Sequence, residues 1–274
     1  MKPKTHQLNK IALLGALWIS LSTTPAATAY TSPSPDNEGW ENIFNGKDLT
    51  GWSIKFTGYV LGENYKDTFH VTDETIKVSY DKYDHFNGEF GHLFYNTPYS
   101  SYRLRFDYRF FGEQTPGGPG WAFRNSGVMV HSQSAESMTL NQEFPVSIEV
   151  QLLGQTGAGT RPTGNVCTPG THIVLSGMLE KEHCINSTSP TFKGDGWVTA
   201  EVEVLAGKSI RHFINNKLVM EYSAPQLDSS EVDTQHLLSG GNNDDMLLKS
   251  GYIAFQAESH PVEFKNIKIL QIDE

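Results

Sequence analysis

The segment SIEVQLLG carries two polar side chains, Glu149 and Gln151, between apolar ones. In an extended strand alternate residues share a face, so both side chains would point to the same side. A carboxylate there can remove a proton or bind a metal ion, and the neighbouring amide can orient a sugar hydroxyl. The same alternation is also typical of a solvent-facing strand, which is the alternative interpretation.

Two further segments offer side chains with related chemistry. The segment NSGVMVH begins at Asn125, directly after Arg124, and ends at His131, whereas FQAES places Gln256 and Glu258 on one face. Histidine and glutamate can act as acids or metal ligands, and the amides and arginine can orient polar ligands. A single histidine is more often a structural residue with satisfied hydrogen bonds, so His131 has that alternative.

An aromatic side chain could complete a sugar site. Trp121 follows the Gly- and Pro-rich segment 112–120, and we expect its ring to be exposed, while Trp40, Trp52 and Trp197 are expected in the core. Glu201 and Glu203 also alternate with apolar residues, and there we expect a solvent-facing pair. The chain has no GxSxG, HExxH or phosphate-binding glycine motif, which argues against the enzyme classes that depend on them.

The elements that must position these residues are short strands. Runs such as YRLRFDYRF at 102–110 alternate apolar and polar residues and are bounded by Gly, Pro, Asn or Asp, and Asn215-Asn216 is typical of a tight hairpin turn. No segment has sustained helical periodicity. The pattern predicts an all-β protein, an antiparallel β-sandwich of the concanavalin or jelly-roll kind, with a concave sheet face as a natural groove for an oligosaccharide.

The beginning of the sequence has the features of a secretory signal peptide. Three lysines precede an apolar run that is too short to span a bilayer, and Ala27-Thr28-Ala29 offers a cleavage site. We therefore predict a signal peptide at 1–29, a flexible lead-in at 30–38 and one β-sandwich domain at 39–274. The protein would be exported to the periplasm or the extracellular space, with no membrane span after signal removal; an uncleaved anchor is the alternative.

Net charge and cysteine content limit the classes of partner that the protein can bind and indicate its compartment. The formal net charge of −10 makes nucleic acid an improbable partner. Cys167 and Cys184 are the two cysteines of the sequence and bracket a segment rich in Gly, Thr and Ser. In an oxidising compartment they would form one disulfide, with two free thiols as the alternative.

Several segments together resemble the bacterial 3-keto-disaccharide hydrolase family. They run in order from WENIFNGKDLTGW at 40–52 to PVEFKNIKI at 261–269, with YSSYRLRFDYRF, NSGVMVH, SIEVQLLG and GYIAFQAE between them. The resemblance implies a concanavalin-like jelly roll and cleavage of glycosides already oxidised to a ketone at C3. A base would remove the proton on C2, and the enolate would expel the group on C1.

Such chemistry needs a base and a group that stabilises the enolate, for which a divalent cation is one candidate. By the resemblance, Glu149 and Gln151 fall on the family's E-x-Q strand. The resemblance also places Asn125 on the family's NSG segment and Glu258 on its acidic position after the closing Gln. Together with the residues singled out above, the expected roles are Glu149 as base or metal ligand, His131 and Glu258 as metal ligand or acid, and Asn125, Gln151, Arg124, Trp121 and Gln256 as substrate-binding groups.

Two other interpretations remain for the same sequence. A lectin-like module of this fold would bind an oligosaccharide or glycoside without cleaving it, and a structural surface module would do neither. Convergence of the acids and a histidine within metal-binding or proton-transfer reach would favour the enzyme, whereas an exposed aromatic platform with scattered amides would favour the lectin.

Overall fold

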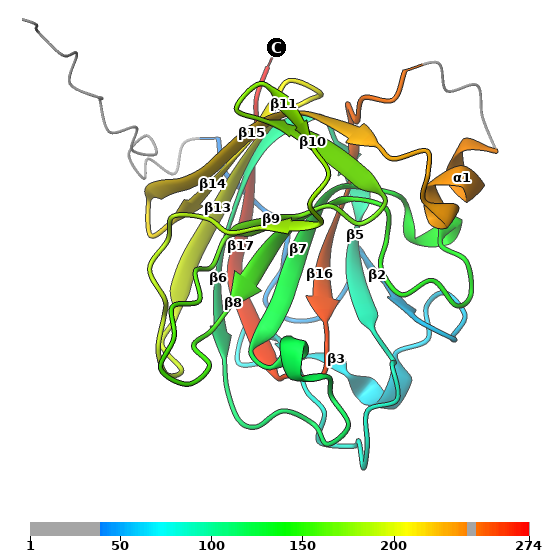
Figure 1. The fold of residues 1–274 in the computed structure, drawn as a ribbon. Helices are drawn as coiled ribbons and strands as arrows, with labels where there is room; N and C mark the ends of the chain where they lie inside the picture. Colours follow the sequence, from blue (N-terminus) through cyan, green and yellow to red (C-terminus); the bar gives the residue numbers. More distant parts are fainter. Residues whose placement is uncertain (1–38, 240–244, 274) are drawn as a thin grey trace, which may run out of the picture.

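The computed structural model describes residues 39–239 and 245–273. The signal peptide and lead-in expected at 1–38 lie outside the described residues. Two antiparallel β-sheets pack face to face (Figure 1), so the predicted jelly-roll-like sandwich is confirmed. Within the described ranges, no helix has the length and apolar character needed to cross a membrane.

The larger sheet has ten strands and packs with one face against the smaller sheet. In spatial order its strands are β11 (Met178–Glu180), β10 (Thr171–Leu175), β15 (Lys217–Leu227), β14 (Ser209–Ile214), β13 (Val198–Leu205), β6 (Ser101–Phe110), β17 (Val262–Gln271), β4 (Thr75–Val78) and β3 (Phe69–Thr72), with β1 (Glu41–Asn42) paired to β17.

The smaller sheet has seven strands, and its outward face carries most of the predicted site. In spatial order its strands are β12 (Cys184–Ile185), β9 (Asn165–Cys167), β8 (Ile148–Leu153), β7 (Asn125–Ser132), β16 (Gly251–Ala257), β5 (Gly91–Tyr99) and β2 (Trp52–Phe56). Short helical segments are α1 (Val232–Leu238) and the 3-10 turns Tyr65–Asp67, Gly120–Ala122 and Ala135–Ser137.

The core lies between the sheets and follows the alternation of the strands. Phe106 on β6 contacts Phe255 on β16, with ring centroids 5.3 Å apart, and Phe255 in turn lies 4.6 Å from Phe264 on β17. Apolar residues at alternate positions thus fill the core, which leaves the intervening residues of β7, β8 and β16 on the opposite face. The predicted hairpin is also present, because Asn215 and Asn216 have φ of 47° and 63° between β14 and β15.

The outer face of the larger sheet corrects two expectations. Glu201 is 3% exposed and pairs with Arg103 and Arg105, so it is a buried ion-pair residue and not a solvent-facing one. Trp197 does not enter the core but lies beneath Lys265, whose Nζ is 4.0 Å from the ring centroid. Long cationic side chains on neighbouring strands cover these groups, which the alternation of a single strand does not reveal.

Candidate active site

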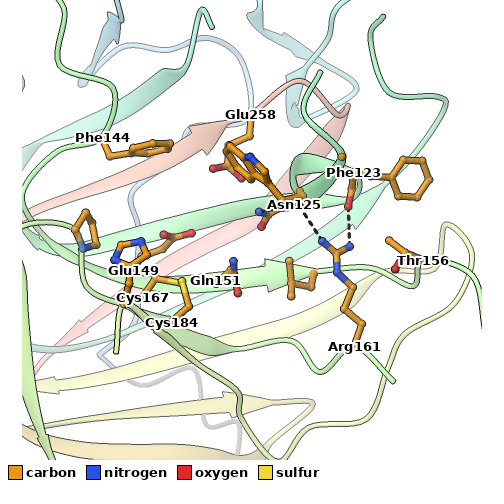
Figure 2. A pocket seen from close by; sticks show the side chains of 15 residues that line it. Phe123, Asn125, Phe144, Glu149, Gln151, Thr156, Arg161, Cys167, Cys184 and Glu258 are labelled. Atoms are coloured by element: carbon orange, nitrogen blue, oxygen red, sulfur yellow. Dashed lines mark hydrogen bonds between the residues drawn. A yellow bond between two sulfur atoms is a disulfide. The ribbon is translucent and has the colours of Figure 1, made fainter. Parts of the chain in front are cut away.

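A cleft of about 790 Å³ opens on the outward face of the seven-stranded sheet (Figure 2). Strands β7, β8 and β9 provide its floor, and the segments around 120–123 and 154–161 and strand β12 provide walls. The residues that line it are Gly120, Trp121, Phe123, Asn125, Phe144, Glu149, Gln151, Leu153, Thr156, Arg161, Cys167, Pro169, His183, Cys184 and Glu258.

Glu149 points into this cleft because its neighbours on β8, Ile148 and Val150, point into the core. Its residue is 7% exposed, and burial raises the pKa of its carboxyl group well above the ordinary value. The carboxylate lies over Gly127 of the adjacent strand, where no side chain occupies the space. Glu149 is therefore a stronger base than an exposed carboxylate.

Glu258, the residue directly after β16, lines the same cleft. It is 3% exposed, and its Oε2 has no hydrogen-bond partner among the described residues. Burial first, and then repulsion from Glu149, raise the pKa of the Glu258 carboxyl, while the Arg161 charge opposes the shift. Both carboxyl groups therefore hold a proton more tightly than an exposed carboxyl group does, so one can serve as an acid while the other, once deprotonated, serves as a base.

Two amides flank the carboxyl groups. The Asn125 Nδ2 donates to the Trp121 carbonyl at 3.4 Å, whereas its buried Oδ1 has no partner among the described groups. The Gln151 Oε1 accepts a hydrogen bond of 3.0 Å from Asn165, which leaves the amide nitrogen of Gln151 facing the cleft. The site thus offers one acceptor and one donor for sugar hydroxyls or a carbonyl oxygen.

Arg161 is a lining residue that the sequence analysis missed. Its Nη1 donates to the carbonyls of Phe123 and Gly154 at 2.6 and 2.8 Å, and its Nη2 to that of Trp121 at 3.2 Å. Figure 2 shows the guanidinium reaching the Phe123 segment across the cleft. Burial lowers the pKa of Arg161, and the charge of Glu258 opposes that shift. A fixed positive charge therefore lies within electrostatic reach of the carboxyl pair.

An aromatic rim borders the cleft. Trp121 is 53% exposed, as predicted, and stacks on Phe90 with ring centroids 5.8 Å apart. Phe144, which also lines the cleft, lies 5.0 Å from Phe90. These rings provide an apolar surface on which a sugar ring can stack.

The predicted disulfide is present and forms part of the cleft wall. Cys167 on β9 is bonded to Cys184 on β12, and both residues line the cleft. Cys167 is also the cross-strand partner of Glu149. The bond thus fixes the two strands next to the candidate base.

Three residues of the sequence-predicted site do not line the cleft. Gln256 is fully buried on β16. Arg124 lies outside the cleft lining and donates hydrogen bonds to the Gly194 carbonyl and the Asp195 carboxylate. His131 is 1% exposed, and its Nε2 lies 2.9 Å from the Ala206 carbonyl of the other sheet.

The position of His131 has a local backbone cause. The pairing of β7 with β16 shifts register between Tyr252 and Ala254, so that β7 contains an extra residue there. His131 has φ of 48° at this bulge, which reverses the alternation that would have turned its ring to the cleft.

The predicted metal ligands, Glu149 and His131, therefore do not form one donor set. Among residues 39–239 and 245–273, no group of three or more His, Cys, Asp or Glu side chains is arranged to hold a metal ion. Glu149 and His131 do not fit the divalent cation that the sequence led us to expect at this pair.

Comparisons with known proteins give a family for the chain. Residues 39–270 match the family model of the 3-keto-alpha-glucoside-1,2-lyase-like domain. No functionally curated protein matches the chain.

Two solved structures from Parabacteroides distasonis ATCC 8503, provisionally described as glycosyl hydrolases, share the fold. One is 22% identical, with 86% of this chain and 95% of that chain covered and a TM-score of 0.50. The other is 16% identical, with coverages of 85% and 99% and a TM-score of 0.50. At these identities the likeness establishes the fold alone.

Proposed function

The chain belongs to the family of 3-keto-alpha-glucoside-1,2-lyase-like domains, and on that basis we propose that it cleaves glycosides that carry a ketone at C3. The C3 ketone acidifies the proton on C2. Removal of that proton gives an enolate, which re-forms the ketone and a C1–C2 double bond as the C1–oxygen bond breaks. Addition of water across the double bond then gives the free 3-keto sugar.

In this proposal Glu149 is the base that removes the C2 proton. Its raised pKa supports the assignment, because a base whose pKa approaches the working pH combines the deprotonated form with a useful affinity for the proton. Glu258 holds the proton retained by the pair and gives it to the departing glycosidic oxygen.

Developing negative charge on the C3 oxygen needs a stabilising group. Arg161 supplies a half-buried positive charge held by backbone carbonyls, and a fixed charge in a partly dehydrated site acts strongly on such an enolate. The Gln151 amide nitrogen and the Asn125 Oδ1 orient the ring through its oxygens and hydroxyls, and Trp121 contributes a stacking surface.

The observation that carries the proposal is the convergence of Glu149 and Glu258 in one cleft with raised pKa values. A lectin-like module gains nothing from two buried carboxyl groups that repel each other, because both cost stability and neither stacks on a sugar. The convergence therefore favours an enzyme over a binding module. The disulfide supports export to an oxidising compartment as part of the same proposal.

The test is incubation of the purified protein with 3-keto-trehalose or a 3-keto-glucoside, with and without EDTA. Released aglycone and a transient ultraviolet band of the keto-enol intermediate are expected, and the rate should be the same in EDTA. Absence of turnover on several oxidised sugars, together with binding of unoxidised glycans, would instead support the lectin-like module.

A further inference from the structure

A second hollow of about 550 Å³ adjoins the cleft and shares three lining residues with it. Phe144, Pro169 and His183 line both spaces. Pro169 follows closely after Cys167, the cross-strand partner of Glu149, so the two spaces meet beside the candidate base. A ligand longer than one sugar ring can therefore extend from the cleft into the hollow.

The hollow differs from the cleft in its chemistry. Apart from Phe144, which it shares with the aromatic rim, its wall carries neutral hydrogen-bonding groups, among them Asn141, Thr168 and Thr171. These side chains and the nearby backbone suit a ligand with many hydroxyl groups. The hollow is therefore shaped and lined for a polar ring and not for an apolar group.

Acidic residues outnumber basic ones around the hollow. Glu143, Glu231 and Asp233 line it, and Asp228 does so while its Oδ2 lies 3.1 Å from the Nε2 of His172. Among the described residues that line the hollow, Lys181 is the single lysine or arginine. An anion placed in the hollow would lie beside these carboxylates, within the screening length of about 8 Å at physiological salt, so they would repel it.

We propose that this hollow is the leaving-group subsite, and that it accepts an uncharged or amine-bearing sugar while it discriminates against a phosphorylated or carboxylated one. The inference rests on the proposed function, because it places the keto ring at Glu149 and Glu258. It adds a substrate class, namely disaccharides whose second sugar carries no negative charge.

The experiment uses 3-keto-glucosides that share the keto ring and differ in the leaving group: methanol, glucose, glucosamine and glucose 6-phosphate. The wild-type kcat/KM for the phosphorylated substrate should be roughly tenfold or more below that for the glucose substrate. Replacement of two exposed lining acids, Glu143→Gln with Glu231→Gln, should reduce this discrimination severalfold. The rate for the methyl glycoside, which is too short to enter the hollow, should be unchanged. Glu41→Gln, an exposed acid on β1 of the other sheet, is the matched control and should keep the wild-type discrimination.

Binding separates the two proposals. Calorimetry on a Glu149→Gln protein measures the affinity for the same ligands without cleavage. Charge-selective binding that the double variant weakens supports the subsite, even if the wild type cleaves nothing and the proposed function fails. Cleavage of the neutral and phosphorylated substrates at equal kcat/KM would overturn the subsite and leave the proposed function intact. An absence of binding by every ligand would overturn both.

Discussion

The carboxylate of Glu149 occupies the space that a side chain on Gly127 would fill. A methyl group at Gly127 would lie 2.8 Å from both Cγ and Cδ of Glu149. The register pairs Glu149 with Met129, so the glutamate side chain leans two residues along β7 to reach the bare strand. Glycine at this position therefore sets where the candidate base is held.

Gly127→Ala should move the base without removing it. The added methyl group forces the Glu149 side chain aside, and a displacement of about 1 Å in a reacting group can cost roughly 10²-fold in rate. The measurement is kcat on a 3-keto-glucoside, with circular dichroism to establish folding. Gly196→Ala is the matched control, because nothing lies within 4 Å of its added methyl group. A folded Gly127→Ala protein with the wild-type kcat would contradict this role.

Removal of either carboxyl group should abolish most of the activity. Glu149→Gln loses the base and Glu258→Gln loses the acid, so each should lower kcat by roughly 10²- to 10⁴-fold. Glu136→Gln, on an exposed turn, should leave kcat unchanged. A wild-type rate in either cleft variant would exclude the role assigned to that residue.

The same two groups should make stability depend on pH in a defined direction. Their pKa values are raised in the folded protein above the ordinary 4.5, so the folded state binds their protons more tightly than the unfolded chain does. The stabilisation that comes from this tighter proton binding is greatest below pH 4.5. It is lost as the pH rises towards the raised pKa values, by up to about 1.4 kcal/mol per pH unit for one proton.

Denaturant unfolding of Glu258→Gln at pH 5 and pH 8 checks this sign. The variant should gain stability over the wild type at pH 8 and gain less at pH 5, since glutamine needs no proton. An equal difference between the two proteins at both values would show that the Glu258 carboxyl is not perturbed.

Loss of the disulfide should affect both stability and activity. By the chain-entropy estimate, a bond between cysteines 17 residues apart contributes about 3 kcal/mol. Reduction, or Cys167→Ser with Cys184→Ser, should lower Tm and also kcat/KM, because the bond borders the cleft. The double variant should not respond further to reductant, which serves as the control for unspecific effects of the reagent.

Truncation of the exposed rim should affect binding more than chemistry. Trp121→Ala removes a stacking surface while Glu149 and Glu258 stay in place, so KM should rise severalfold with little change in kcat. A fall in kcat as large as that of Glu149→Gln would instead show that Trp121 positions the reacting atoms.

The sequence predicted the parts of the site that depend on a single strand. Alternation along β8 placed Glu149 and Gln151 on one face, and both line the cleft. It failed for His131, because the bulge in β7 arises from pairing with another strand. Arg161 gave no signal, since its position depends on hydrogen bonds to the backbone carbonyls of Phe123 and Gly154, which no side-chain pattern specifies.

The fold was predictable for the same reason, since apolar and polar residues alternate within most single strands. The outer ion pairs were not, because Glu201 is buried by arginines that come from β6 across the sheet. Cross-strand contacts of this kind depend on register, which one strand does not specify.

The carboxyl groups come from a strand and a strand end, whereas the loops and the short strand β12 supply the walls. Much of the wall is therefore separate from the residues that carry the chemistry, Arg161 excepted. The loop residues 155–160, which lie between β8 and Arg161, could be exchanged or randomised in a library while the sheet that holds Glu149 is left intact, which makes the protein a scaffold on which substrate range can evolve without rebuilding its chemistry.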